Sequence, residues 1–274
     1  MAVHSALPSA LERAAGAVLE ASGIRHIAHG EGEHVRAGEL AAADADAVAL
    51  IGPFRSRAVA ETVEVTAPAG LPLLAPVATW AGLTRDDEPG CEDDPADHRG
   101  TVLRMVARDT EVAFRLAAHL RARNERALLI SGSGEYGSQL AGQLRLAELP
   151  VGDEADVVVV AGVPAEPGVE RVARTEALPV IAFDGIQGLD IDFERGVWVV
   201  LPFAEDPTHG VEAARAARLV ADALAGGART RAEVLAACRS AGPFDEHGDP
   251  VHPPVWLWRA EPGWKLRPDR ELEH

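Results

Sequence analysis

Residues 47–56 read AVALIGPFRS, and this stretch decides the fold class. Its first five residues are all apolar, whereas a strand with one face in water alternates apolar and polar residues. A strand covered on both faces is typical of a parallel sheet flanked by helices. The same pattern recurs in other short runs separated by helical patterns: 71–74, 127–130, 157–160, Val180–Phe183 and Val197–Leu201. The sequence therefore predicts an α/β fold.

Helix boundaries and the end of the chain support this prediction. The patterns Ser9-x-x-Glu12 and Thr230-x-x-Glu233 are typical of capping boxes at helix starts. The C-terminal residues differ in character, because apolar and aromatic runs flank an Ala-Glu-Pro-Gly turn, at 254–258 and 264–266. These runs predict a terminal β-hairpin.

Composition limits the classes of function. The chain has 274 residues, of which 47% are hydrophobic, so it can bury a large core and is long enough for two lobes. Its formal net charge of -17 repels nucleic-acid phosphates and anionic lipid. We therefore expect no nucleic-acid partner and no membrane insertion.

The N-terminal residues and the cysteines suggest a location. Residues 1–20 lack the basic region and the apolar run of a secretory signal, and the two cysteines, Cys91 and Cys238, lie far apart in different contexts. Unpaired thiols suit a reducing compartment. The sequence alone therefore favours a cytoplasmic protein.

Polar side chains follow the predicted strands at the edge where ligands bind in open α/β sheets. Ser56 follows the strand at 47–51, Thr79 follows 71–74, Tyr136 follows 127–130, and Asp184 follows Val180–Phe183. Hydroxyls and helix N–H groups can hold a carboxylate, and an aspartate can hold an ammonium group. Together they predict a receptor for a zwitterion. Alternatively, Ser56 and Thr79 are helix caps and Asp184 is a turn residue.

Two enzymatic alternatives stay open. Gly132, Gly134 and Gly137 match the spacing of a dinucleotide-binding loop between a strand and a helix, which would make the protein a nicotinamide-dependent enzyme. A Ser–His–Asp triad is the other, although no residue pattern marks a nucleophile. No motif indicates a metal site, and we expect no catalytic residue and no cofactor.

Several motifs, taken in order, carry a resemblance to a known family: AVALIGPF (47–54), GLPLLAPVAT (70–79), LRM (103–105), Tyr136-Gly137, GPFDEHGD (242–249) and Pro253-Pro254-Val255. The chain resembles the type I periplasmic binding proteins, and specifically the branched-chain amino acid (Leu/Ile/Val) receptors of ABC transporters. The resemblance implies two Rossmann-like lobes with parallel sheets, joined by three crossovers and closing on a small ligand.

The resemblance also implies domain boundaries. The N-terminal lobe would comprise residues 1–106 plus 205–242, and the C-terminal lobe 107–204 plus 243–271. The crossovers would lie near Ala107, Glu205 and Pro243. Residues 272–274 are interpreted as the start of a purification tag.

Site residues follow from the same resemblance. Ser56 and Thr79 would hold the ligand carboxylate, the carbonyl of Val77 and the side chain of Asp184 would hold the ammonium group, and Tyr136 would line the cleft. The family's loop after the first strand is short here, so the resemblance does not imply a pocket for the ligand side chain.

Arg55 and Trp80 are two further candidates, because they flank Ser56 and Thr79. They could recognise an anionic or flat group on the ligand, or they could fill the cleft. We therefore predict non-catalytic binding of a small amino-acid-like or carboxylate ligand by a solute-binding or sensor protein, with a protein partner or a homodimer as a further option. The alternative on the same fold is an interaction module that has lost its ligand.

Overall fold

The structure is a computed structural model that describes residues 1–85, 100–152, 154–175, 178–183, 185–189, 191–203 and 209–273. The chain forms two compact units. Unit 1 comprises Met1–Ala107 and Thr208–Pro253, and unit 2 comprises Arg108–Pro207 and Pro254–His274. The chain therefore crosses between the units three times. Each unit is described by itself below.

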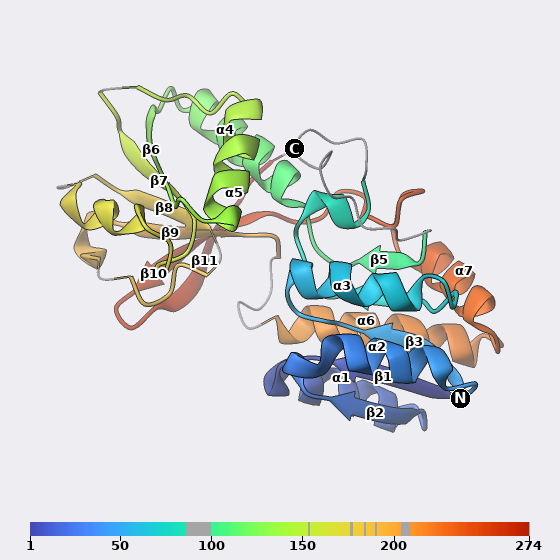
Figure 1. Ribbon diagram of the computed structural model, residues 1–274. Helices are drawn as coiled ribbons and strands as arrows, with labels where there is room; N and C mark the ends of the chain where they lie inside the picture. The colour runs from blue at the N-terminus through green and yellow to red at the C-terminus, as the bar shows by residue number, and fades with distance from the viewer. Residues whose placement is uncertain are drawn as a thin grey trace. The chain divides into compact units, whose positions relative to one another are not determined.

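Unit 1 contains a parallel five-stranded sheet in the order β2-β1-β3-β4-β5 (Figure 1). Its strands are β1 (Ala2–Ala6), β2 (Arg25–His29), β3 (Ala47–Ile51), β4 (Leu73–Ala75) and β5 (Val102–Arg104). The run predicted at 71–74 thus begins later than expected. Because every strand is parallel, the carboxyl ends of neighbouring strands meet at one edge of the sheet.

Helices cover both faces of this sheet and explain why β3 is apolar throughout. They are α1 (Ser9–Ala21), α2 (His34–Ala43), α3 (Ser56–Thr66), α6 (Gly210–Ala225) and α7 (Arg231–Ala241), with short 3₁₀ turns η1 (Glu31–Glu33) and η2 (Ala81–Leu83). One buried cluster joins Val48 and Ile51 to residues of α1, α6 and α7. A second joins Ala47 and Leu50 to α2 and α3. Both faces of β3 are therefore out of water.

Unit 2 contains a six-stranded sheet in the order β11-β10-β9-β8-β7-β6. The strands are β6 (Ala127–Ser131), β7 (Val157–Ala161), β8 (Val180–Phe183), β9 (Val197–Leu201), β10 (Trp256–Glu261) and β11 (Lys265–Glu271). Strands β6 to β9 are parallel, and β10 and β11 add the predicted C-terminal hairpin in antiparallel register. The helical elements are α4 (Asp109–Ala122), α5 (Glu135–Leu146), η3 (Val169–Arg174) and η4 (Phe193–Arg195). The predicted α/β fold class is confirmed.

One predicted capping box is confirmed and the other is wrong. Thr230 and Glu233 form a complete box at the start of α7. At α1 the cap is Pro8, and Ser9 is already the first helical residue. The carboxylate of Glu12 instead contacts His26, with 2.8 Å between Oε1 and Nε2. This tertiary contact replaces the local one that the spacing suggested.

The third crossover differs from the expectation near Pro243, because the chain leaves unit 1 after Pro253. Residues 243–253 are tied to β5 instead. The N–H of Arg104 donates to the Gly248 carbonyl at 2.9 Å, and Arg104 Nε donates to Asp249 Oδ1 at 3.0 Å. The family motif at 242–249 therefore packs against the sheet of unit 1.

Leu272 belongs to the fold of unit 2, although its position suggested a tag remnant. Its side chain is buried, and its N–H donates to the Val255 carbonyl at 2.7 Å. Its carbonyl accepts a hydrogen bond from Arg115. Leu272 thus packs as part of unit 2, and the interpretation of residues 272–274 as a tag remnant stays a prediction.

Candidate functional site

The candidate site lies at the carboxyl ends of β3 and β4 in unit 1. Between β3 and α3 the chain turns at Gly52, whose φ of 97° is in the region that favours glycine. A Cβ at Gly52 would lie 2.7 Å from the Ala6 carbonyl oxygen, so the turn passes too close to β1 for a side chain. This tight turn places Ser56 at the first position of α3.

The structure brings Ser56 and Thr79 together. Ser56 Oγ accepts hydrogen bonds from the N–H groups of Thr79 and Trp80, each at 3.2 Å. The serine hydroxyl thus joins the start of α3 to the loop after β4. The N-cap residue of α3, Arg55, gives no side-chain hydrogen bond to the first turn. The backbone N–H groups in the first turn of α3, together with the helix dipole, can therefore bind an anion.

Two polar groups of the loop after β4 have no partner in the described part of the chain. The Thr79 hydroxyl and the Val77 carbonyl oxygen make no hydrogen bond there, whereas the carbonyls of Ala78 and Trp80 both accept from Arg104 at 2.8 Å. Contacts of both groups with a ligand stay predictions. A hydroxyl can donate to a carboxylate, and a carbonyl oxygen can accept from an ammonium group.

The flanking candidates have their own local contacts. Arg55 is largely exposed, and its Nε lies 3.8 Å from Glu31 Oε1. Arg57 pairs with Glu61 within α3, with 3.1 Å between Nε and Oε1. The Trp80 ring lies over Gly82, where a Cβ would approach its Cζ2 to 2.4 Å, and packs beside the core cluster of α2 and α3. Trp80 thus fills space within unit 1, and its contact with a ligand stays a prediction.

A surface cavity of about 350 Å³ lies beside the turn between β3 and α3. Its lining consists of Glu31, Gly32, His34, Pro53, Phe54, Arg55 and Ala58. The cavity mixes a basic side chain with an acidic one, and His34 Nε2 lies 2.8 Å from Glu61 Oε2. The search along the ends of apolar strands did not reach Glu31 or His34, because they follow β2, a strand with exposed and half-buried residues and no apolar run.

In unit 2 the structure describes some of the predicted residues. Tyr136 is the second residue of α5 and is half-buried. Asp184 lies outside the described residues. The contributions of Tyr136 and Asp184 to a ligand site therefore stay predictions.

The glycine loop before α5 already holds a carboxylate of the chain itself. The N–H of Gly137 donates to Glu166 Oε1 at 3.1 Å, and that of Val163 reaches Glu166 Oε2 at 3.4 Å. A Cβ at Gly132 or Gly134 would lie 2.2 or 2.3 Å from the nearer Glu166 oxygen. The glycines thus make room for Glu166, and a dinucleotide pyrophosphate would have to displace this anion. The arrangement disfavours the nicotinamide alternative.

A serine, a histidine and a carboxylate do meet in unit 1, but not as a catalytic triad. Ser5 Oγ lies 2.7 Å from His26 Nε2 and also contacts Glu12. Both Ser5 and Glu12 therefore approach the same imidazole nitrogen, whereas a triad needs the acid on the other nitrogen. Ser5 is also fully buried, which denies a substrate access to its hydroxyl.

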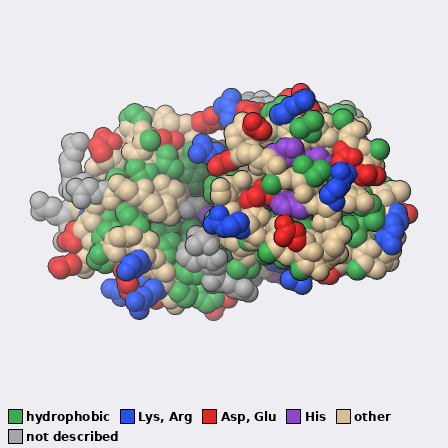
Figure 2. All heavy atoms as spheres, turned by 90° about the horizontal axis from the view of Figure 1, so that it is seen from below, with side chains coloured by type: hydrophobic (Ala, Val, Ile, Leu, Met, Phe, Trp, Pro, Cys, Tyr) green, Lys and Arg blue, Asp and Glu red, His purple; other side chains and the backbone are tan. Residues whose placement is uncertain are grey.

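Histidines form a second cluster on the opposite face of the same strand pair. His4 Nδ1 lies 3.0 Å from His29 Nε2, and His4 Nε2 lies 3.2 Å from Asp44 Oδ2. Figure 2 shows histidine side chains gathered on the unit 1 face that carries β2. Among the residues that the structure describes, no group of three or more His, Cys, Asp or Glu side chains could hold a metal ion.

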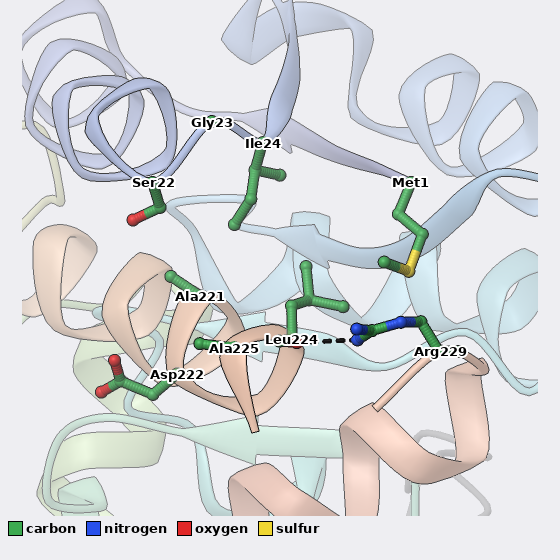
Figure 3. A pocket seen from close by; sticks show the side chains of 9 residues that line it. All are labelled: Met1, Ser22, Gly23, Ile24, Ala221, Asp222, Leu224, Ala225 and Arg229. Carbon is green, nitrogen blue, oxygen red and sulfur yellow. Dashed lines mark hydrogen bonds between the residues drawn. The ribbon is translucent and has the colours of Figure 1, made fainter. Parts of the chain in front are cut away.

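A larger cavity, of about 490 Å³, lies elsewhere on unit 1, where α1 and α6 end (Figure 3). It is lined by Met1, Ser22, Gly23, Ile24, Ala221, Asp222, Leu224, Ala225 and Arg229. Arg229 is the one basic side chain in this lining, and it donates to the carbonyls of Leu224 and Ala228 at 2.7 Å. Its charge is therefore already used to cap α6, and the cavity offers no convergent set of ligand groups.

Comparison with known proteins identifies the fold. No protein-family model and no curated protein sequence matches the chain. Among solved structures, an ABC transporter substrate-binding protein from Desulfitobacterium hafniense in complex with Leu has a TM-score of 0.75 at 18% identity, covering 98% of this chain and 99% of that chain. The chain has the fold of ABC transporter substrate-binding proteins. This confirms the predicted type I periplasmic-binding fold.

Two further structures extend this result. A branched-chain amino acid ABC transporter periplasmic ligand-binding protein from Burkholderia xenovorans has a TM-score of 0.75 at 13% identity, covering 99% of this chain and 95% of that chain. A solute-binding protein from R. palustris in complex with benzoate has a TM-score of 0.69 at 15% identity, covering 98% and 95%. All are described as binding proteins and none as an enzyme.

The comparison corrects the expected location. The sequence favoured a cytoplasmic protein, but the similar structures are substrate-binding proteins of ABC transporters, and one of them is described as periplasmic. The expectation of a cytoplasmic protein is therefore wrong. Unpaired cysteines and residues 1–20 were its basis, and neither is a property of the fold. In the part of the chain that the structure describes, no helix has the length and apolar character to span a bilayer.

Proposed function

We propose that the protein binds a small amino-acid-like or carboxylate ligand without changing it chemically, as a substrate-binding protein that serves an ABC transporter. The contact between Ser56 and the N–H groups of Thr79 and Trp80 carries this proposal. It gathers a serine hydroxyl, a threonine hydroxyl and the first turn of α3 at one edge of the sheet. Such a group of donors suits a carboxylate.

The ligands of similar structures narrow the chemistry. Leu and benzoate share a carboxylate and an apolar body, but only Leu has an ammonium group. In this proposal the Val77 carbonyl oxygen accepts a hydrogen bond from the ammonium group of an amino acid. We therefore propose amino acids as the first class of candidate ligands and simple carboxylates as the second. Micromolar binding, about 8 kcal/mol, requires only a few charge-assisted contacts in a desolvated site.

A thermal-shift screen followed by calorimetry tests the proposal. The probes are L-leucine, L-isoleucine and benzoate, and leucinol serves as the control that lacks a carboxylate. A ligand at a hundred times its Kd stabilises the folded state by about 2.7 kcal/mol. We expect at least one carboxylate to raise the melting temperature and leucinol to have no effect. A chain that responds to no carboxylate would refute the proposal and favour an interaction module without a ligand.

A further inference from the structure

The motif at 242–249 ends in a turn that is held against β5. Asp245 Oδ1 accepts from the N–H groups of His247 and Asp249 at 2.9 and 3.0 Å, which fixes the turn internally. A Cβ at Gly248 would lie 2.2 Å from the Val102 carbonyl oxygen, so the turn approaches the strand as closely as a glycine allows. The turn thereby presents the Asp249 carboxylate to the interior of unit 1, where this residue is 2% exposed.

The Asp249 carboxylate holds a fully buried arginine. Arg104 Nε donates to Asp249 Oδ1 at 3.0 Å, and Thr84 Oγ1 donates to the same oxygen at 2.6 Å. Arg85 Nε donates to the other oxygen at 3.0 Å. Arg104 itself is 0% exposed. A buried guanidinium requires such a carboxylate partner, because an unpaired charge in the interior is very costly.

The rest of the Arg104 guanidinium grips the loop after β4. One terminal nitrogen donates to the Ala78 carbonyl at 2.8 Å, and the other donates to the Trp80 carbonyl at 2.8 Å and to Thr84 Oγ1 at 2.7 Å. The two carbonyls flank Thr79. Since the Thr79 N–H is bound to Ser56 Oγ, the backbone around Thr79 is held from both sides.

We propose that Asp249 and Arg104 are positioning residues for the ligand site, which fix the Val77–Trp80 loop so that Thr79 and the Val77 carbonyl can meet a ligand. This inference rests on the proposed function. The planar fork of an arginine can bridge two carbonyls and a carboxylate at once, whereas the ammonium group of a lysine cannot span them. Charge alone therefore does not suffice, and the geometry of the fork is required.

The test compares two conservative substitutions. Arg104→Lys removes the fork but keeps the charge. Arg231→Lys is the matched control, because Arg231 also lies in unit 1 and donates to the carbonyls of Ala41, Ala42, Asp44, Ala47 and Ala69. Ala47 begins β3, so the control arginine binds carbonyls at the amino end of that strand, whereas Thr79 follows the carboxyl end of its neighbour β4. Hydrogen exchange of the Thr79 and Trp80 amides and the Kd for L-leucine and benzoate are measured for both variants.

We expect Arg104→Lys to speed exchange of both amides by about tenfold or more and to raise the Kd by a similar factor, since hydrogen bonds to a charged group are lost. Arg231→Lys is expected to change neither quantity. The proposal is overturned if Arg104→Lys matches the wild type or the control, or if the amides exchange faster while the Kd stays unchanged.

Two further results are decisive. If Arg104→Lys does not fold, Asp249→Glu replaces it, because it keeps the negative charge that Arg104 needs and moves the carboxylate by one carbon. A wild-type Kd and wild-type exchange in that variant would overturn the proposal. A wild-type protein that binds neither probe would instead refute the proposed function. The exchange comparison would then decide separately whether the pair holds the loop.

Discussion

Helices α3 and α5 begin in the same structural context, but their N-terminal N–H groups differ in the partners that they have. Both helices follow a strand of a parallel sheet, and both present N–H groups at its carboxyl edge. At α5 the Glu166 carboxylate sits on the glycine loop. At α3 no side-chain cap is present, and Ser56 Oγ joins the helix to the Thr79 loop. The comparison teaches that one architecture can satisfy the N–H groups of a helix start with a carboxylate of the chain itself or, as we propose for α3, with a ligand.

Removing the serine hydroxyl is the strongest way to break this comparison. Ser56→Ala takes away a donor to the ligand and leaves two loop N–H groups without their acceptor. We expect affinity for a bound carboxylate to fall by about 2 kcal/mol, or about thirtyfold, as measured by calorimetry. Ser22→Ala is the control, because the Ser22 hydroxyl at the end of α1 donates a local hydrogen bond to the Val18 carbonyl. Equal affinities of Ser56→Ala and wild type would remove α3 from the site.

Asp184→Ala sharpens the comparison by separating the two ends of a zwitterion. If Asp184 holds an ammonium group, affinity for L-leucine falls by about tenfold, whereas affinity for benzoate is unchanged. Calorimetric titrations of both ligands into the same variant provide the measurement. A parallel loss for both ligands would mean that Asp184 acts on the fold and not on the ammonium group.

Emptying the glycine loop tests the other half of the comparison. Glu166→Ala leaves the N–H groups of Gly137 and Val163 without their carboxylate acceptor, so we expect stability to fall by about 1 kcal/mol. Inorganic phosphate should then stabilise this variant more than the wild type in a thermal-shift assay. Glu170→Ala is the matched control, since Glu170 accepts from the Gly168 N–H at 2.7 Å outside the glycine loop. Identical phosphate responses of the two variants would contradict the account.

The smallest expected effect is the loss of stability at acidic pH. Each histidine that contributes to this loss lies in one of the two units. Burial, and then the neighbouring His4, lower the pKa of His29. In unit 2, burial and the nearby Arg123 lower the pKa of His119. A lowered folded-state pKa means that the unfolded chain binds a proton first. The free energy of unfolding is therefore highest above the usual histidine pKa of about 6.5, where the histidine is neutral in both states. It falls as the pH drops from there toward the lowered pKa of the folded state.

His29→Asn should therefore reduce the loss of stability of unit 1 between pH 7.5 and 5.5, as measured by urea unfolding. The groups that face His29 include His4, His26, Glu12 and Glu33, so the substitution changes only part of the pH dependence. The exposed His252, which has a φ of 54°, provides the control His252→Asn. A pH dependence that His29→Asn leaves unaltered would place the sensitivity elsewhere.

The buried parallel strands were predictable because their apolar runs directly reflect burial on both faces. Ala47–Ile51, Val180–Phe183 and Val197–Leu201 have their predicted bounds. β5 gave no such run, since one of its three residues is the buried Arg104. Burial of that arginine depends on Asp249, far away in sequence, and no local pattern encodes this contact.

Some residues of the candidate site could likewise be predicted from the sequence, and others could not. Ser56 and Thr79 could be predicted because they follow the ends of apolar strands, and strand ends can be recognised from the local sequence. The roles of Arg104 and Glu166 depend on tertiary contacts, and Glu166 stands in a loop without a motif. The glycine spacing alone suggested a dinucleotide, because spacing indicates room for an anion and does not say which anion fills it.

The most direct test of the central claim is to follow the backbone amide resonances during a titration with a carboxylate that binds. The account predicts that the amides of Ser56, Thr79 and Trp80 shift and saturate at the Kd found by calorimetry, while that of Gly137 keeps its contact with Glu166 and moves less. Shifts concentrated at Gly137 and Val163, with Thr79 unmoved, would contradict it.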